Sequence, residues 1–298
     1  MKRFLLLGLF LFQACSSDSD PASDANIEEP EVLMESIVSA SVAFAYSNAV
    51  VQDFLTTPGN AYVSGYFYFE EDLASDIIFG LDIEFLEGVA DPLRFEGADW
   101  MALAGFDRTG RLWFPIGYPE NREGVPTDTD NWIVQDTGIE LQPNSWYKMT
   151  IACDFNSLEF VSVRLEGNGL DQTFAIAGNP LEYPNYAPFD EAALTGYTFA
   201  LRGRDFAPDN AAGFDIYFDD IEMGVYQGSG PGTVIFQDGF ENQATIGDIP
   251  IAGIPIPLAQ IPEQRWYLEN DKAKLALSSH YARTGQQSLR CRADLTQE

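Results

Sequence analysis

Aromatic and arginine side chains recur at positions where they could bind a sugar. Tyrosine and tryptophan rings stack on the apolar face of a pyranose, while neighbouring arginines, amides and carboxylates bond its hydroxyl groups. Tyr62, Tyr66 and Tyr68 alternate with apolar residues, which predicts that they share one face of a strand. The other ligand-binding candidates are Trp113, Tyr118, Trp132, Arg202 and Arg204. The alternative is that rings at this spacing belong to the core or to cross-strand pairs.

Two acidic residues, Asp82 and Glu84, alternate on another predicted strand and therefore share a face. Segment 80–86 resembles the active-site strand of the laminarinase and xyloglucan-transferase family of jelly-roll hydrolases. In that family three acids alternate, the first as nucleophile and the last as acid/base, as retaining hydrolysis requires. Gly80 occupies the first position here. The resemblance therefore implies that this mechanism lacks its nucleophile, which leaves Asp82 and Glu84 as catalytic candidates only by analogy.

Other catalytic arrangements are scarce in the sequence. A polysaccharide lyase needs a Tyr/His or equivalent base, with cationic groups that neutralise the substrate carboxylate. His280 is the only histidine. A Gly-x-Ser-x-Gly elbow and zinc-ligand spacing are both absent from the sequence. These observations favour a binding protein over an enzyme, with a glycoside hydrolase or lyase as the alternative.

The elements that must position these residues read as strands. Nearly every segment after residue 36 alternates apolar with polar residues and ends at Gly, Pro, Asn or Asp. Examples are 61–70, 147–155, 214–218 and 288–295, and 107–110 separates two such runs as a hairpin turn. We therefore expect an all-β protein with antiparallel sheets.

Two passages resemble opposite ends of the jelly-roll domains found in carbohydrate-binding modules and in concanavalin A-like and laminin-G-like proteins. Residues 215–222 (DIYFDDIE) resemble the last strand of such domains. Residues 236–241 (FQDGFE), Trp266 and residues 282–290 resemble the first third. The resemblance implies a jelly-roll β-sandwich with its closing motif before its opening motif.

This order has two interpretations. In the favoured one the chain is circularly permuted: a main block, 37–226, is joined by the linker 227–232 to a block, 233–298, that supplies the first strands of the same sandwich. Surface termini tolerate such a rearrangement. In the other interpretation, residues 233–298 begin a second jelly roll that stops early.

The resemblance also implies a structural calcium ion where the first and last strands meet. The matching residues here are Asp219, Asp220, Asp238 and Glu241. Calcium takes six to eight oxygen ligands, and clustered carboxylates are chemically suited to it. The alternative is that these acids are solvated residues at strand ends.

Charge excludes one class of partner. The chain has 16 basic and 46 acidic residues, a formal net charge of −30. A surface this acidic repels phosphate backbones, so nucleic acid is not an expected partner.

The N-terminus resembles that of a bacterial lipoprotein. Lys2 and Arg3 precede an apolar stretch, 4–12, and a cleavage point that ends on Cys15, which predicts a signal peptide over residues 1–14 and a lipid on Cys15. The Ser/Asp/Ala-rich residues 15–36 predict a flexible tether. Ser16 resembles the residue at this position in lipoproteins sorted to the outer membrane of Gram-negative cells.

Cys153 and Cys291 then remain, and each lies on the inward face of a predicted strand. In an oxidising compartment they allow one disulfide, and two buried free thiols are the alternative.

The combined expectation is a non-enzymatic, lipid-anchored protein that binds a polysaccharide or another cell-surface component and contacts the membrane only through its anchor. A structural or adhesion subunit that binds a protein is a further alternative.

Overall fold

The computed structural model describes residues 32–34, 38–46, 59–73, 77–91, 96–117, 131–181, 194–205, 214–226, 232–241, 265–268 and 273–293. Within these ranges the regular secondary structure is entirely β-strand, and every strand pair is antiparallel. The predicted signal peptide, Cys15 and Tyr118 lie outside the described residues.

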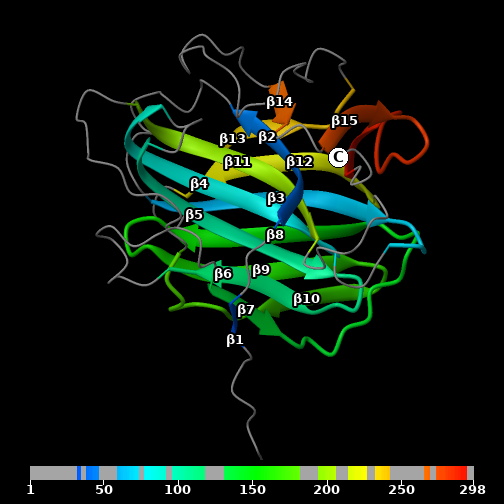
Figure 1. Ribbon diagram of the computed structural model, residues 1–298, viewed down its shortest axis with the longest axis horizontal. Helices are drawn as coiled ribbons and strands as arrows, with labels where there is room; N and C mark the ends of the chain where they lie inside the picture. The colour runs from blue at the N-terminus through cyan, green and yellow to red at the C-terminus, as the bar shows by residue number, and fades with distance from the viewer. Residues whose placement is uncertain are drawn as a thin grey trace, which may run out of the picture.

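The strands form two sheets, which lie face to face (Figure 1). Sheet A has the order β1 (Val32–Met34), β7 (Asn131–Gln135), β6 (Leu112–Ile116), β5 (Glu96–Asp107), β4 (Ile77–Asp91), β11 (Leu194–Asp205), β2 (Val38–Tyr46) and β14 (Arg265–Leu268). Sheet B has the order β10 (Leu170–Phe174), β9 (Glu159–Gly167), β8 (Tyr147–Asp154), β3 (Asn60–Phe69), β12 (Phe214–Val225), β16 (Ser288–Ala293) and β15 (Ala273–Ser278), and β13 (Thr233–Asp238) also pairs with β12.

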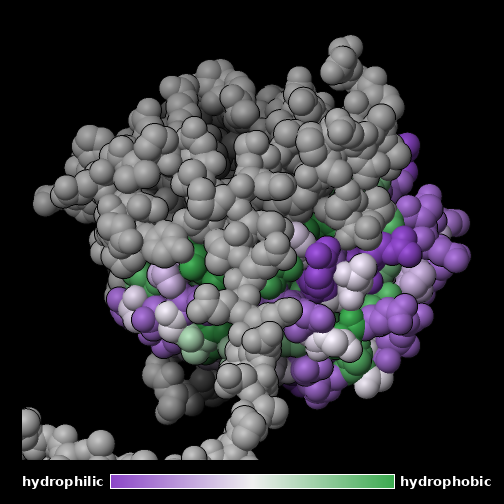
Figure 2. All heavy atoms as spheres, turned by 60° about the horizontal axis from the view of Figure 1, so that its bottom comes forward, coloured by the Kyte–Doolittle hydropathy of each residue, from purple (hydrophilic) through white to green (hydrophobic). Residues whose placement is uncertain are grey.

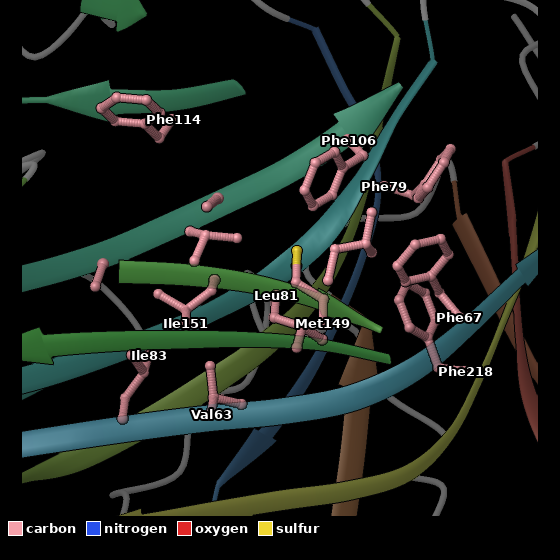
Figure 3. Close-up of a cluster of buried hydrophobic side chains, with 14 of the residues drawn as sticks. Val63, Phe67, Phe79, Leu81, Ile83, Phe106, Phe114, Met149, Ile151 and Phe218 are labelled. Atoms are coloured by element: carbon pink, nitrogen blue, oxygen red, sulfur yellow. The ribbon is translucent and has the colours of Figure 1, made fainter. Parts of the chain in front are cut away.

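The hydrophobic core fills the space between the sheets. Figure 3 shows side chains from sheet A, among them Phe79 and Leu81, meeting Phe67, Met149 and Phe218 from sheet B. The Phe67 ring packs on Phe79 with centroids 4.8 Å apart. The structure is thus an all-β antiparallel sandwich, as the alternating pattern predicts, and it belongs to the jelly-roll class that the resemblance implies.

The predicted faces are confirmed where side chains are described. In β8 every second residue, from Tyr147 to Cys153, is buried, and the intervening residues are partly exposed. The turn at 107–110 also forms: the Gly110 N–H donates to the Asp107 carbonyl at 2.9 Å, and Gly110 has a φ of +83°. Figure 2 shows mainly hydrophilic side chains on the described surface in view, as expected for so acidic a chain.

Residues 233–298 contribute strands to both sheets. A backbone irregularity between Asp219 and Glu222 divides β12 into two halves. The first half pairs with β16, with Phe218 opposite Leu289, and the second half pairs with β13, with Ile221 opposite Asp238. On the other side, β14 pairs with β2 in sheet A. Circular permutation as the origin of this connectivity stays a prediction.

The disulfide considered for Cys153 and Cys291 is not formed, and both thiols are free and buried. Cys153 lies on β8 and Cys291 on β16, with β3 and β12 between them. Three strand spacings of about 4.8 Å separate the two backbones by about 14 Å. A disulfide needs Cα atoms within about 7 Å, so these thiols cannot meet in this sheet.

Candidate functional site

The predicted catalytic strand is β4, at the centre of sheet A. Asp82 is fully buried on it, and its Cα partners are Leu103 on β5 and Ala200 on β11. Glu84, two residues on, is opposite Met101 and Thr198. Catalysis by these two residues stays a prediction.

Gly80, at the position where the hydrolase family has its nucleophile, lies opposite Gly105. A Cβ atom at residue 80 would lie 2.1 Å from the Ala104 carbonyl oxygen, which is well inside contact distance. The missing acid therefore reflects a lack of space between β4 and β5, and a carboxylate could not be placed there without moving backbone.

The other sheet A candidates are spread over the sheet. Trp113 is buried. Its indole Nε1–H donates to Asp107 Oδ2 at 2.9 Å, and its ring packs in a small cluster with Ile78, Met101 and Leu103. By backbone register, Trp132 pairs with Pro115, Arg202 with Gly80 and Arg204 with Ile78.

The three predicted tyrosines on β3 lie on the outer face of sheet B, but they differ in surroundings. Tyr62 is 9% exposed, donates its hydroxyl to Glu222 Oε1 at 2.7 Å and packs against Tyr226 with centroids 5.2 Å apart. Tyr62 is thus engaged in the fold. Tyr66 and Tyr68 instead belong to an aromatic group near the other end of the strand.

We call this group the tyrosine cluster, and its members are Tyr66, Tyr68, Trp146, Tyr217 and Tyr281. Tyr68 is its centre: the Tyr281 ring stacks on it at 4.3 Å, Trp146 lies at 5.3 Å and Tyr217 at 5.9 Å, measured between centroids. Tyr68 and Tyr217 are buried, whereas Tyr66, Trp146 and Tyr281 keep part of their surface exposed. The cluster therefore presents three partly exposed rings on a buried aromatic base.

Polar groups surround the rings. The Tyr281 hydroxyl donates to Glu70 Oε1 at 2.8 Å, and the Tyr68 hydroxyl donates to Asn144 Oδ1 at 3.0 Å. Arg290 makes two hydrogen bonds to the Asp215 carboxylate, at 2.9 and 2.5 Å. Such bidentate pairs fix both side chains in one geometry.

Two cations lie beside a single ring. The Arg283 guanidinium lies 4.7 Å and the Lys148 ammonium 5.9 Å from the Tyr66 centroid, both within cation–π distance. Among the described residues neither cation forms an ion pair. Within the described part of the chain, both cations therefore lie against a ring and not against a carboxylate, in a protein with nearly three acids for every base.

The hydroxyl groups of Tyr281 and Tyr217 stay protonated. The hydrogen bond to Glu70, followed by burial, raises the pKa of Tyr281 well above its usual range. Burial is the main cause that raises the pKa of Tyr217 to about 12, with the Asp215 charge adding to it. These groups are therefore neutral donors at physiological pH and not ready bases.

The four calcium candidates lie near one another beside the β12–β13 pair. Asp220, Asp238 and Glu241 line one surface pocket, and Asp219 is fully buried. Yet among the described residues no three His, Cys, Asp or Glu side chains gather in a way that could hold a metal ion. Both Asp219 oxygens and Glu241 Oε1 already accept backbone N–H groups. These N–H groups compete with a cation for the same oxygens, and calcium binding stays a prediction.

Sequence reasoning missed several residues of this site. Tyr217 lies on β12, within the predicted strand 214–218, but Trp146, Tyr281 and Arg283 lie outside the strands, where no periodic signal marks them. Arg283 and Tyr281 reach the cluster only because segment 279–287 folds back over β12.

Within the described residues, no helix is long and apolar enough to cross a membrane.

No family model matches the chain, and no curated protein sequence matches it. Among solved structures, the chain is similar to a family 7 alginate lyase in complex with substrate, at 15% identity and a TM-score of 0.31, over 57% of this chain and 64% of that one. It is similar to the PL-14 alginate lyase from Aplysia kurodai at 12% identity and a TM-score of 0.32, over 59% and 87%.

A third similar structure is the CBM40 of the Ruminococcus gnavus IT-sialidase bound to sialyllactose, at 8% identity and a TM-score of 0.25, over 57% and 90% of the two chains. At such identities and TM-scores, no residue of this chain takes a role from these proteins.

Proposed function

We propose that this protein binds a polysaccharide through the tyrosine cluster, without cleaving it, while a lipid on Cys15 holds it at the outer membrane. The observation that carries the binding proposal is the group of partly exposed rings beside two cations, Arg283 and Lys148, on the outer face of sheet B. The anchor rests on the lipoprotein-like start of the sequence, with residues 15–36 as the tether.

The chemistry of the cluster suits a sugar. Rings such as Trp146 and Tyr281 offer apolar faces for stacking, and Asn144, Glu70 and Arg290 provide hydrogen-bonding groups at the edges. The rings are already packed against one another, so little side-chain freedom is lost when a ligand binds. The two cations beside Tyr66 favour a glycan that carries acidic groups.

Polysaccharide cleavage by a lyase mechanism is the alternative function for these residues. The ring centroids of His280 and Tyr281 lie 4.3 Å apart, and Arg283 lies on the same loop. A catalytic tyrosine must give up its proton easily. The hydrogen bond to Glu70 raises the pKa of Tyr281 instead. Binding is therefore the function that the cluster supports better.

The test is retention of the purified full chain on a panel of neutral and acidic polysaccharides, with the products analysed for released oligosaccharides. We expect retention without release. Trp146→Ala and Tyr281→Ala should each weaken binding about fivefold to tenfold, the value of one aromatic contact of about 1 kcal/mol.

Tyr226→Ala is the matched control, because Tyr226 is 38% exposed but lies outside the cluster. It should bind like the parent protein. Release of oligosaccharides would make the protein an enzyme, and co-purification with a protein partner without glycan retention would favour the adhesion alternative.

A further inference from the structure

Two residues of the proposed binding face, Tyr281 and Arg283, come from segment 279–287, which connects β15 to β16. This segment has no regular secondary structure, so its backbone N–H groups find no partner in a strand ladder. The N–H groups of an irregular segment packed on a protein need other acceptors. In this loop the acceptors are carboxylates.

Asp219 supplies the first contacts. Its Oδ2 accepts the N–H groups of Arg283 at 2.7 Å and Thr284 at 3.2 Å, and its Oδ1 accepts the Asp220 N–H at 2.8 Å. The side chain is fully buried, so its charge is balanced by these donors instead of by water. Asp220 adds a third contact to the loop, because its Oδ1 accepts the Thr284 hydroxyl at 2.7 Å.

Glu241 holds the far end of the loop. Its Oε1 accepts the N–H groups of Gln286 at 2.8 Å and Gln287 at 3.0 Å. Gly285, directly before these two residues, has a φ of +61°, and a Cβ atom there would lie 2.1 Å from the same Oε1. The carboxylate is pressed so closely against the loop that only glycine fits at residue 285.

These contacts also bear on the calcium expectation. A cation binds the lone pairs of carboxylate oxygens, and here those oxygens face the positive ends of N–H dipoles. Both Asp219 oxygens and Glu241 Oε1 are engaged by N–H groups in this way. Charge-assisted hydrogen bonds of this kind are stronger than neutral ones, so the acids can hold the loop by themselves.

We infer that Asp219, Asp220 and Glu241 form a metal-independent clamp that fixes loop 279–287 on sheet B and thereby positions Tyr281 and Arg283 for the ligand. They are positioning residues and touch no glycan. The positioning role rests on the proposed function, whereas the clamp itself does not.

Hydrogen exchange of the full chain, measured by mass spectrometry without any glycan, tests the clamp. Asp219→Asn and Glu241→Gln should each accelerate exchange in peptides covering 283–287 at least tenfold. Asp219 is buried and Glu241 is exposed. If Asp219→Asn does not fold, Glu241→Gln still tests the clamp, because a change at an exposed residue leaves the fold intact.

Asp238→Asn is the discriminating control, because Asp238 lines the same pocket and its Oδ1 accepts the Phe240 N–H. Neither this variant nor a chelator should change loop exchange. Either of two results would show that a cation holds the loop. One is faster loop exchange in the parent protein after chelation, and the other is loop exchange in Asp238→Asn that is as fast as in Glu241→Gln. Unchanged exchange in both clamp variants would also overturn the inference.

The consequence for binding is measured separately. Glu241→Gln should weaken glycan binding with the melting temperature unchanged, which a merely structural acid would not do. If the loop opens in Glu241→Gln and the parent protein retains no glycan, the clamp stands and only the proposed function fails. A loop that opens without any loss of glycan binding would remove the positioning role.

Discussion

Tyr62 and Tyr68 show how neighbours decide the role of a residue. Both lie on the same face of β3, as alternation predicts. Tyr62, however, lies over Gly224 and Gly232, where a Cβ atom would come within 2.5 and 2.8 Å of its ring. Small neighbours let this ring lie flat and donate to Glu222, so Tyr62 supports the sheet. Sequence periodicity identifies a face, but it does not report what covers each position on it.

Tyr62→Phe should make the protein less sensitive to alkali. Burial, followed by the hydrogen bond to Glu222, raises the pKa of Tyr62 above its usual value of about 10. The native state therefore keeps this proton where the unfolded chain loses it, so its contribution to stability is present below about pH 10 and declines as the pH rises further.

The measurement is the free energy of unfolding of both proteins at pH 9 and pH 11. At pH 9 the variant should lose about 1 kcal/mol with the hydrogen bond. The difference between parent and variant should shrink at pH 11. A difference that stays constant over this range would contradict a raised pKa.

At the scale of elements, the strands could be predicted and their surroundings could not. Strands β3, β8, β12 and β16 form where alternation predicts them, and Leu289 and Cys291 on β16 are buried, because period-two alternation is a local property. The burial of Trp113 and the fold-back of loop 279–287 depend on residues distant in the chain. Asp219 and Glu241 accept N–H groups of this loop, and no side-chain pattern in the sequence predicts such contacts.

Gly80→Ala tests the close approach of β4 and β5. A methyl group there would meet the Ala104 carbonyl oxygen and force the strands apart. Overpacking of this kind costs about 1–3 kcal/mol, which thermal or urea unfolding would detect. Gly138→Ala is the control, because no atom lies within 4 Å of a Cβ there and its φ of +67° makes any cost one of backbone strain alone.

At the scale of the whole molecule, the distribution of strands along the chain sets how the protein should unfold. The linker 227–232 reads as a boundary, but the strands after it, β13, β15 and β16, complete the sheet around β12, and β14 joins the opposite sheet. Core residues Phe240, Leu289 and Cys291 come from the same late segment. The late segment therefore shares one core with the main block.

A chain that ends at Tyr226 should consequently fail to fold. It would leave β12 without a partner on one side and would remove Phe240, Leu289 and Cys291 from the core. The full chain should unfold in one cooperative transition by calorimetry and circular dichroism, because both blocks share that core. The truncated chain should show no cooperative transition. Two separate transitions in the full chain, or a truncated chain that melts cooperatively, would instead favour a main domain followed by an incomplete second one.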